Sequence, residues 1–214
     1  SYKDGRLQVG PESAGADPGP AAYKRGGPLT VTDCNVFLGK LNPDHFPAVF
    51  GPNGDAPLDV DACTRVLQEV TDQINAASSQ SLTPEQVAEG FLRIAVDNMA
   101  NAIKKISVER GHDVSKDYAL QSFGGAGGQH ACLVADALNM TRVLIHPFAG
   151  VLSAYGMGLA EVRALREMQA DCALIDCDLV AADLDTLSAG VEAEVRAQGI
   201  SAFTVFRQAH LRPR

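Results

Sequence analysis

Basic residues are scarce in this sequence of 214 residues. Lys and Arg together number 18 against 26 Asp and Glu, which gives a net charge of -8 at neutral pH. Proteins that bind nucleic acids or membrane surfaces through phosphate groups need clustered Lys and Arg. The one pair of adjacent lysines, Lys104 and Lys105, is explained by a single exposed helix face. We therefore expect neither a nucleic acid nor a membrane among the partners.

Paired cysteine motifs are missing as well. The five cysteines include no C-x-x-C pair, and they are Cys34, Cys63, Cys132, Cys172 and Cys177. This pattern predicts reduced, mostly buried thiols in a cytoplasmic protein, without a structural zinc site or any other metal site built by this chain. No signal peptide opens the sequence. Residues 143–160 carry no charged side chain, but His146 and Pro147 interrupt them, so we expect a buried strand, a turn and a buried helix.

The common phosphate-binding motifs are incomplete. Four glycines occur at positions 124, 125, 127 and 128 of the stretch "SFGGAGGQHACLVADALNM", residues 122–140. The third glycine of G-x-G-x-x-G is replaced by Gln or His, and no G-K-[ST] follows. Glycines let a ligand approach the backbone, and the first N–H groups of a helix favour an anion. The residues alone leave a phosphate site and a close-packed empty turn equally open.

Two helices and a parallel strand pair carry the clearest structural signals. Asp59 is predicted to cap a helix that runs to about residue 77. The sequence "TPEQ" at 83–86 forms a capping box for a helix that should stop at Gly111. The spacing of apolar residues after it predicts a parallel strand–helix–strand unit, with strands at 118–123 and 142–146 around a helix at 129–139.

The other segments give weaker patterns. Residues 10–28 are rich in Gly and Pro and predict an ordered loop laid over a surface. A short strand is predicted next, followed by a short helix capped by Asp33. Periodicity and turn signals predict the remaining elements, which are a strand at 29–32, helices at 152–166 and 184–199, and a strand at 202–211.

Two side chains are candidates for chemistry. Asp33 could cap a helix, which is the commoner use of such a residue, or serve as a polar group in a site. His130 falls in the first turn of the predicted helix, where a cation is poorly placed, so its imidazole should be neutral and able to donate or accept a hydrogen bond. Cys132 lies two positions further along and would point away from His130 on a helix.

Four stretches of the sequence carry long, specific motifs. They are "VGPESAGADPGPAAYKRGGPLTVTDCNVFLGKL", "RGHD" at 110–113, "SFGGAGGQHACLVADALNM" and "SAYGMGLAEV" at 153–162. Together they resemble the A-type region of the hydantoinase/5-oxoprolinase family. The resemblance covers nearly the whole chain. Relatives of the hydantoinase and carboxylase types usually have Pro-Leu where Gly128 and Gln129 precede His130, so the sequence is most similar to the 5-oxoprolinase branch. The alternatives to a 5-oxoprolinase are an N-methylhydantoinase, an acetone or acetophenone carboxylase subunit, or a non-catalytic partner-binding module.

The resemblance implies an α/β protein of the actin-like, ribonuclease-H-like ATPase fold, of which this chain would be part of the second lobe with a long-helix insertion. It implies opening of the lactam of 5-oxo-L-proline to L-glutamate, coupled to hydrolysis of ATP with Mg²⁺. In that fold a glycine turn of the second lobe lies against the nucleotide. The matching residues here are Gly124, Gly125, Ala126, Gly127, Gly128 and Gln129, and Asp33 and His130 remain the candidates for a catalytic role.

The same resemblance implies one partial domain over residues 1–214. Its predicted sections are a Gly/Pro-rich loop with a short helix (1–57), a helical section (58–111) and a nucleotide-facing section (117–214). The first-lobe phosphate loop, of the D-x-G-G-T kind, is not in the sequence. We therefore expect a fragment of a longer protein that works with a B-type hydantoinase region or subunit and forms homo-oligomers.

Overall fold

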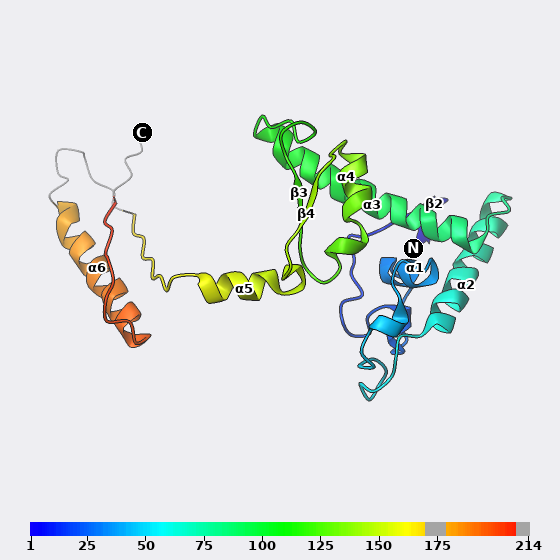
Figure 1. Ribbon diagram of the computed structural model, residues 1–214, viewed down its shortest axis with the longest axis horizontal. Helices are drawn as coiled ribbons and strands as arrows, with labels where there is room; N and C mark the ends of the chain where they lie inside the picture. Colours follow the sequence, from blue (N-terminus) through cyan, green and yellow to red (C-terminus); the bar gives the residue numbers. More distant parts are fainter. Residues whose placement is uncertain (170–178, 209–214) are drawn as a thin grey trace. The chain divides into compact units, whose positions relative to one another are not determined.

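The computed structural model describes residues 1–169 and 179–208. It divides into two units, Ser1–Tyr155 and Gly156–Arg214, and each is described by itself. Helix α5 (Leu152–Leu159) crosses the division, and α6 (Leu179–Ala197) belongs to the second unit. The elements of the first unit are labelled in Figure 1 where space allows, and they are β1 (Tyr2–Lys3), β2 (Arg6–Leu7), η1 (Ala21–Tyr23), α1 (Val31–Phe37), η2 (Pro43–His45), α2 (Val60–Ser78), α3 (Pro84–Glu109), β3 (Leu120–Ser122), η3 (Gly127–Gln129), α4 (Ala131–Ala137), β4 (Val143–Ile145) and η4 (Ala149–Val151).

The Gly/Pro-rich segment is an ordered loop, as predicted. Its residues Ala21 and Ala22 are buried. The backbone of Gly27 passes so close to Gly19 that a Cβ atom at position 27 would lie 1.8 Å from the Gly19 carbonyl oxygen. Only glycine permits this approach, because it has no Cβ atom.

The strand predicted at 29–32 is wrong, because α1 already begins at Val31. Thr30 is the N-cap, and Asp33 is the third helical residue rather than the cap. The two residues form a capping box, in which the Thr30 hydroxyl accepts from the Asp33 N–H and the Asp33 carboxylate accepts from the Thr30 N–H. These reciprocal bonds satisfy free donors at the helix start, which outweighs the strand propensity of the β-branched residues.

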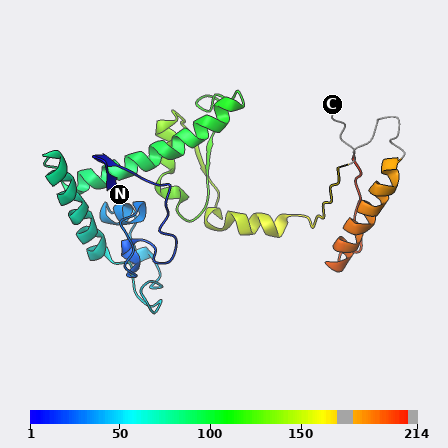
Figure 2. The same cartoon turned by 180° about the vertical axis from the view of Figure 1, so that it is seen from behind.

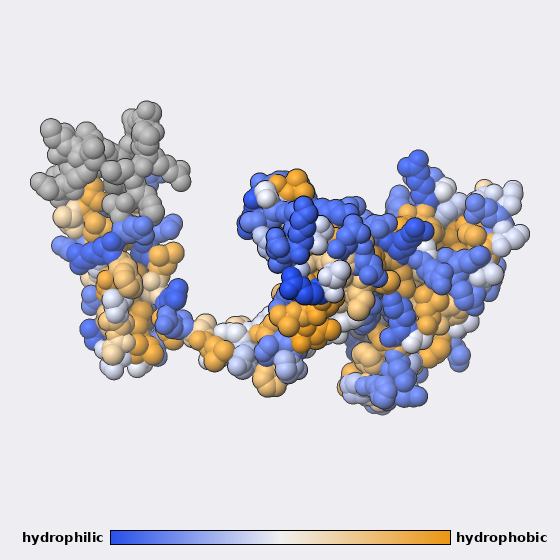
Figure 3. All heavy atoms as spheres, turned by 45° about the horizontal axis from the view of Figure 1, so that its top comes forward, coloured by the Kyte–Doolittle hydropathy of each residue, from blue (hydrophilic) through white to orange (hydrophobic). Residues whose placement is uncertain are grey.

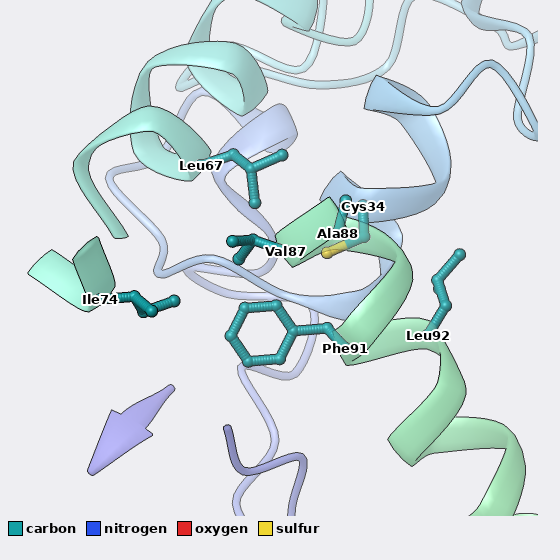
Figure 4. Packing of buried hydrophobic residues seen from close by; sticks show 7 residues of the cluster. All are labelled: Cys34, Leu67, Ile74, Val87, Ala88, Phe91 and Leu92. Carbon is teal, nitrogen blue, oxygen red and sulfur yellow. The ribbon is translucent and has the colours of Figure 1, made fainter. Parts of the chain in front are cut away.

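Helices α2 and α3 begin where the capping residues predict. The Asp59 carboxylate accepts from the Ala62 N–H, and Thr83 and Gln86 form the expected capping box. Helix α3 ends with Arg110 as its C-cap, directly before Gly111. Figure 4 shows how α1, α2 and α3 contribute to one apolar cluster of buried side chains, which comprises Cys34, Leu67, Ile74, Val87, Ala88, Phe91 and Leu92.

The predicted parallel strand–helix–strand unit is confirmed. Strands β3 and β4 pair in parallel, with Leu120 opposite Val143. The connecting helix is shorter than the predicted 129–139, because η3 takes the glycines and α4 covers only Ala131–Ala137. Helix α4 packs on α3, and Figure 2 shows this part of the chain from behind, with α3 as the long green helix.

The burial predicted for residues 143–160 is wrong, because none of these residues is buried. Leu144, Ile145, Phe148 and Val151 are each more than half exposed, and apolar side chains are visible at the surface in Figure 3. An uncharged apolar run predicts that a segment prefers to be covered, but it does not say which part of a protein covers it. Within the described residues of this unit, these four side chains remain uncovered.

In the second unit, α6 agrees with the helix predicted near 184–199. The helix predicted at 152–166 ends earlier, at Leu159. Residues 202–208 of the predicted final strand have no regular structure, and the rest of that strand lies outside the described residues. Arg207 pairs with Asp185 of α6 at 2.6 Å.

The burial of the cysteines agrees with the prediction in part. Cys34 and Cys63 are buried free thiols, whereas Cys132 is exposed. Cys172 and Cys177 lie outside the described residues. The mixture of helices with a parallel strand pair places the chain in the predicted α/β class. Among the helices that the structure describes, none is both long and apolar enough to cross a membrane.

Candidate functional site

The glycine turn, residues 124–129, connects β3 to α4. It is held from one side by the Gly124 N–H, which donates to the carbonyl oxygen of Ala149 at 2.8 Å. The N–H groups of Gly125, Ala126 and Gly128 donate to no acceptor among the described residues, and these three residues are exposed. Neighbouring backbone N–H groups that are left free in this way can bind an anion.

The four glycines of the turn differ in what the fold requires of them. Gly124 has φ +87°, a backbone conformation that side chains rarely adopt. A Cβ atom at Gly127 would lie 2.7 Å from the Ser122 hydroxyl. Gly125 and Gly128 have neither constraint, because a Cβ atom at either would meet nothing within 4 Å. The described structure therefore explains two glycines by folding and leaves the other two next to open space.

Helix α4 adds less to this site than the sequence suggests. It has seven residues, so few peptide dipoles are aligned along its axis. The affinity of the turn for an anion would therefore depend on the free N–H groups of the turn itself.

A buried side chain from α1 contacts the C-terminal end of the turn, directly after the residues with free N–H groups. Asn35 is only 1% exposed, and its amide nitrogen donates to Gln129 Oε1 at 2.8 Å and lies 3.3 Å from His130 Nε2. Reversing the amide would bring two acceptor oxygens, Asn35 Oδ1 and Gln129 Oε1, against each other. The sequence analysis missed Asn35, because its partners are 94 and 95 residues away.

His130 is half-buried at the end of the turn. Burial lowers its pKa, and the positive charge of Lys40 lowers the pKa further, which agrees with the predicted neutral imidazole. Because the Asn35 amide nitrogen can only donate, His130 Nε2 accepts and the ring proton is assigned to Nδ1. His130 Nδ1 and Asn35 Oδ1 are buried without a hydrogen-bond partner among the described residues.

Asp33 takes no part in these contacts and forms a separate hydrogen-bond network. Its fully buried carboxylate accepts from the N–H groups of Ala21, Ala22 and Thr30, from the Thr30 hydroxyl and, at 3.5 Å, from the Cys63 thiol. Five donors leave this carboxylate little capacity to accept a proton from a substrate. The structure thus joins His130 to the glycine turn and places Asp33 in the anchor of the Gly/Pro-rich loop.

The described residues do not fit a metal ion. In residues 1–169 and 179–208, no three His, Cys, Asp or Glu side chains come together in an arrangement that could hold one. We therefore assign no Mg²⁺ ligand to this part of the chain.

Residues 1–166 match the family model described as Hydantoinase/oxoprolinase. The chain belongs to the hydantoinase/oxoprolinase family. It is 51% identical to the 5-oxoprolinase of Saccharomyces cerevisiae over 82% of its length, and 46% identical to that of Dictyostelium discoideum over 81%. The chain spans only 13% and 14% of these two relatives.

Two solved structures resemble the chain as well. The ATP-dependent caprolactamase from Pseudomonas jessenii matches 93% of it with a TM-score of 0.61 and 31% identity, and the match covers 28% of that chain. The nucleotide-free structure of acetone carboxylase matches 92% of it with a TM-score of 0.64, also over 28% of that chain. At 24% identity, this second likeness supports the fold alone.

Proposed function

We propose that this chain is the nucleotide-facing part of an ATP-dependent 5-oxoprolinase. The reaction would add water across the C–N bond of the lactam of 5-oxo-L-proline and give L-glutamate, coupled to hydrolysis of ATP. The observation that carries the proposal is the open space over Gly125 and Gly128, next to three N–H groups without an acceptor in the described structure. The names of the relatives at 51% and 46% identity supply the substrate.

In this proposal, the chain binds and orients the nucleotide. ATP, when bound, supplies the phosphoryl group that activates the lactam oxygen. The N–H groups of Gly125, Ala126 and Gly128 would donate to a phosphate oxygen or to the adenosine. The ligand could approach the backbone closely because glycine has no Cβ atom. Neutral His130 would accept from the Asn35 amide through Nε2 and so hold the end of the turn in place. Asp33 would hold the loop at 10–28 and take no direct part in the chemistry.

The rest of the site would come from outside this chain. We propose that the glycine turn belongs to the second lobe of an actin-like ATPase fold, in which α2 and α3 form the helical section 58–111 and residues 117–214 face the nucleotide. The opposing phosphate loop, the ligands of Mg²⁺ and a B-type region or subunit would complete the enzyme, which would be a cytoplasmic homo-oligomer.

The whole protein provides the test, because this chain is a small part of its relatives. Gly125→Leu should raise the KM for ATP at least about tenfold or abolish hydrolysis of 5-oxoproline, since the side chain would occupy the space of the nucleotide. Gly190→Leu is the matched control, because Gly190 is also exposed, with open space around it. An unchanged ATP dependence in the Gly125→Leu enzyme would contradict the proposal.

A further inference from the structure

We propose that Asn35 is a positioning residue for the glycine turn. Its side-chain amide would fix Gln129 and the ring proton of His130, and thereby the geometry in which the turn presents its free N–H groups. The inference rests on the proposed function, since the nucleotide is the ligand that the turn would orient.

The first argument is the cost of an asparagine at this position. Asn is a poor residue for a helix interior, and burying its amide is favourable only when the amide is hydrogen-bonded. Asn35 nevertheless lies inside α1 and is 1% exposed. The only described partners of its side chain are Gln129 and His130. An apolar side chain of similar size would suit α1 better, so the amide is explained by its hold on the turn.

The second argument is the imperfect satisfaction of the cluster. Asn35 Oδ1 and His130 Nδ1 are sealed from solvent without a partner among the described residues, although each such group costs stability. Helix α1 and the turn are distant in sequence, and among the described residues the Asn35 amide links them directly by hydrogen bonding. Stability alone does not account for buried polar groups that are left unsatisfied, so we assign this contact a role in the site.

The third argument is the chemistry of the two hydrogens on the amide nitrogen. One is directed to Gln129 Oε1 and the other to His130 Nε2, which is thereby the acceptor nitrogen of a neutral ring. A carboxylate at position 35 would keep the size of the side chain, but it would accept hydrogen bonds where the amide nitrogen donates them. Gln129 would have to turn its NH₂ group toward position 35, and His130 would have to carry its proton on Nε2.

The test uses the whole protein with Asn35→Asp and Asn35→Leu. Thr71→Val is the matched control, because Thr71 is also 1% exposed but donates only within its own helix, to the carbonyl oxygen of Leu67. We expect both Asn35 variants to melt close to the control and to raise the KM for ATP about tenfold or more, with a smaller change in kcat at saturating ATP.

A double-mutant cycle with Gln129→Leu separates positioning from general packing. If Asn35 acts through Gln129, the double variant should lose little more kcat/KM for ATP than either single variant. Independent, multiplying losses would overturn the inference. A KM and kcat within twofold of the wild type in both Asn35 variants would do the same, and so would unfolding of both, which would make Asn35 a residue of the core.

The Gly125→Leu variant keeps this test distinct from that of the proposed function. If Gly125→Leu leaves the ATP dependence unchanged, the nucleotide role of the turn fails. If Gly125→Leu weakens ATP binding while both Asn35 variants leave it unchanged, only the role of Asn35 fails.

Discussion

Asp33 Oδ1 lies 2.8 Å from the backbone nitrogen of Ala22 and fastens the Gly/Pro-rich loop to α1. In Asp33→Asn, one of the two oxygens becomes an NH₂ group that faces backbone N–H donors, so at least one hydrogen bond to a charged acceptor is lost. We expect the free energy of unfolding to fall by about 2 kcal/mol. Denaturant titration and proteolysis within residues 10–28 measure the effect, with the exposed Asp44→Asn as control. Equal stability of the two variants would contradict this role for Asp33.

Two adjacent glycines of the same loop should respond differently to alanine. Gly26 has φ +73° but open space around it, so Gly26→Ala should cost about 1–2 kcal/mol through backbone strain. A methyl group at Gly27 would lie 1.8 Å from the Gly19 carbonyl oxygen, and Gly27→Ala should cost about 3 kcal/mol because the backbone must move. Thermal melts of the two variants compare these costs. A Gly27→Ala protein as stable as Gly26→Ala would mean that the loop runs differently.

The glycine turn predicts a separation of stability from ligand binding. Gly128→Ala should leave stability unchanged or increase it by about 0.5 kcal/mol, since it meets no neighbour and restricts the unfolded chain. It should nevertheless weaken ATP binding. Gly124→Ala should lower stability by about 1–2 kcal/mol, because its φ is +87°. Melting curves and ATP titrations on the whole protein would check both variants, and a stability loss at Gly128 would contradict the assignment.

The buried thiols should be unreactive in the folded protein. Burial raises the pKa of Cys34 to about 12, and burial and the Asp33 charge also raise that of Cys63. The reactive thiolate is therefore rare at pH 8. Mass spectrometry after iodoacetamide treatment should find both residues labelled only when denaturant is added. Rapid labelling of either thiol in the folded protein would contradict its described burial.

The same raised pKa values predict a loss of stability in alkali. The thiols stay protonated in the folded protein but ionise in the unfolded chain above about pH 8.5. Their contribution is complete below that pH and falls as the pH rises toward 12, by at most about 1.4 kcal/mol per pH unit for each thiol. Denaturant titrations at several pH values would measure it, and Cys34→Ala should reduce the slope.

Local signals predicted the elements that local interactions determine. The capping residues Asp59 and Thr83 located the starts of α2 and α3, because a cap acts within four residues of its own position. The strand predicted at 29–32 failed for the same reason, since the local capping box of Thr30 and Asp33 favours a helix. The burial predicted for residues 143–160 failed because an apolar run indicates a preference for burial without specifying a partner, and Leu144 and Phe148 are more than half exposed.

The candidate site was predicted only where its residues are contiguous. The glycine pattern and the family motif marked the turn, but neither could distinguish Gly125 and Gly128 from Gly124 and Gly127. That distinction needs the φ angle of Gly124 and the position of the Ser122 hydroxyl. Asn35 could not be assigned to the turn from the sequence, because its contact with Gln129 depends on how α1 lies against a segment 94 residues away.

The unequal constraints on the four glycines also bear on how this turn can change over evolutionary time. If the turn binds a nucleotide as proposed, a descendant that kept this fold without that binding would be free to acquire side chains at positions 125 and 128, where nothing lies within 4 Å. It would still need glycine at 124 for its φ angle, and glycine at 127, where a Cβ atom would lie 2.7 Å from the Ser122 hydroxyl. Relatives with side chains at positions 125 and 128 but glycine at 124 and 127 would therefore be expected to have lost the proposed nucleotide binding.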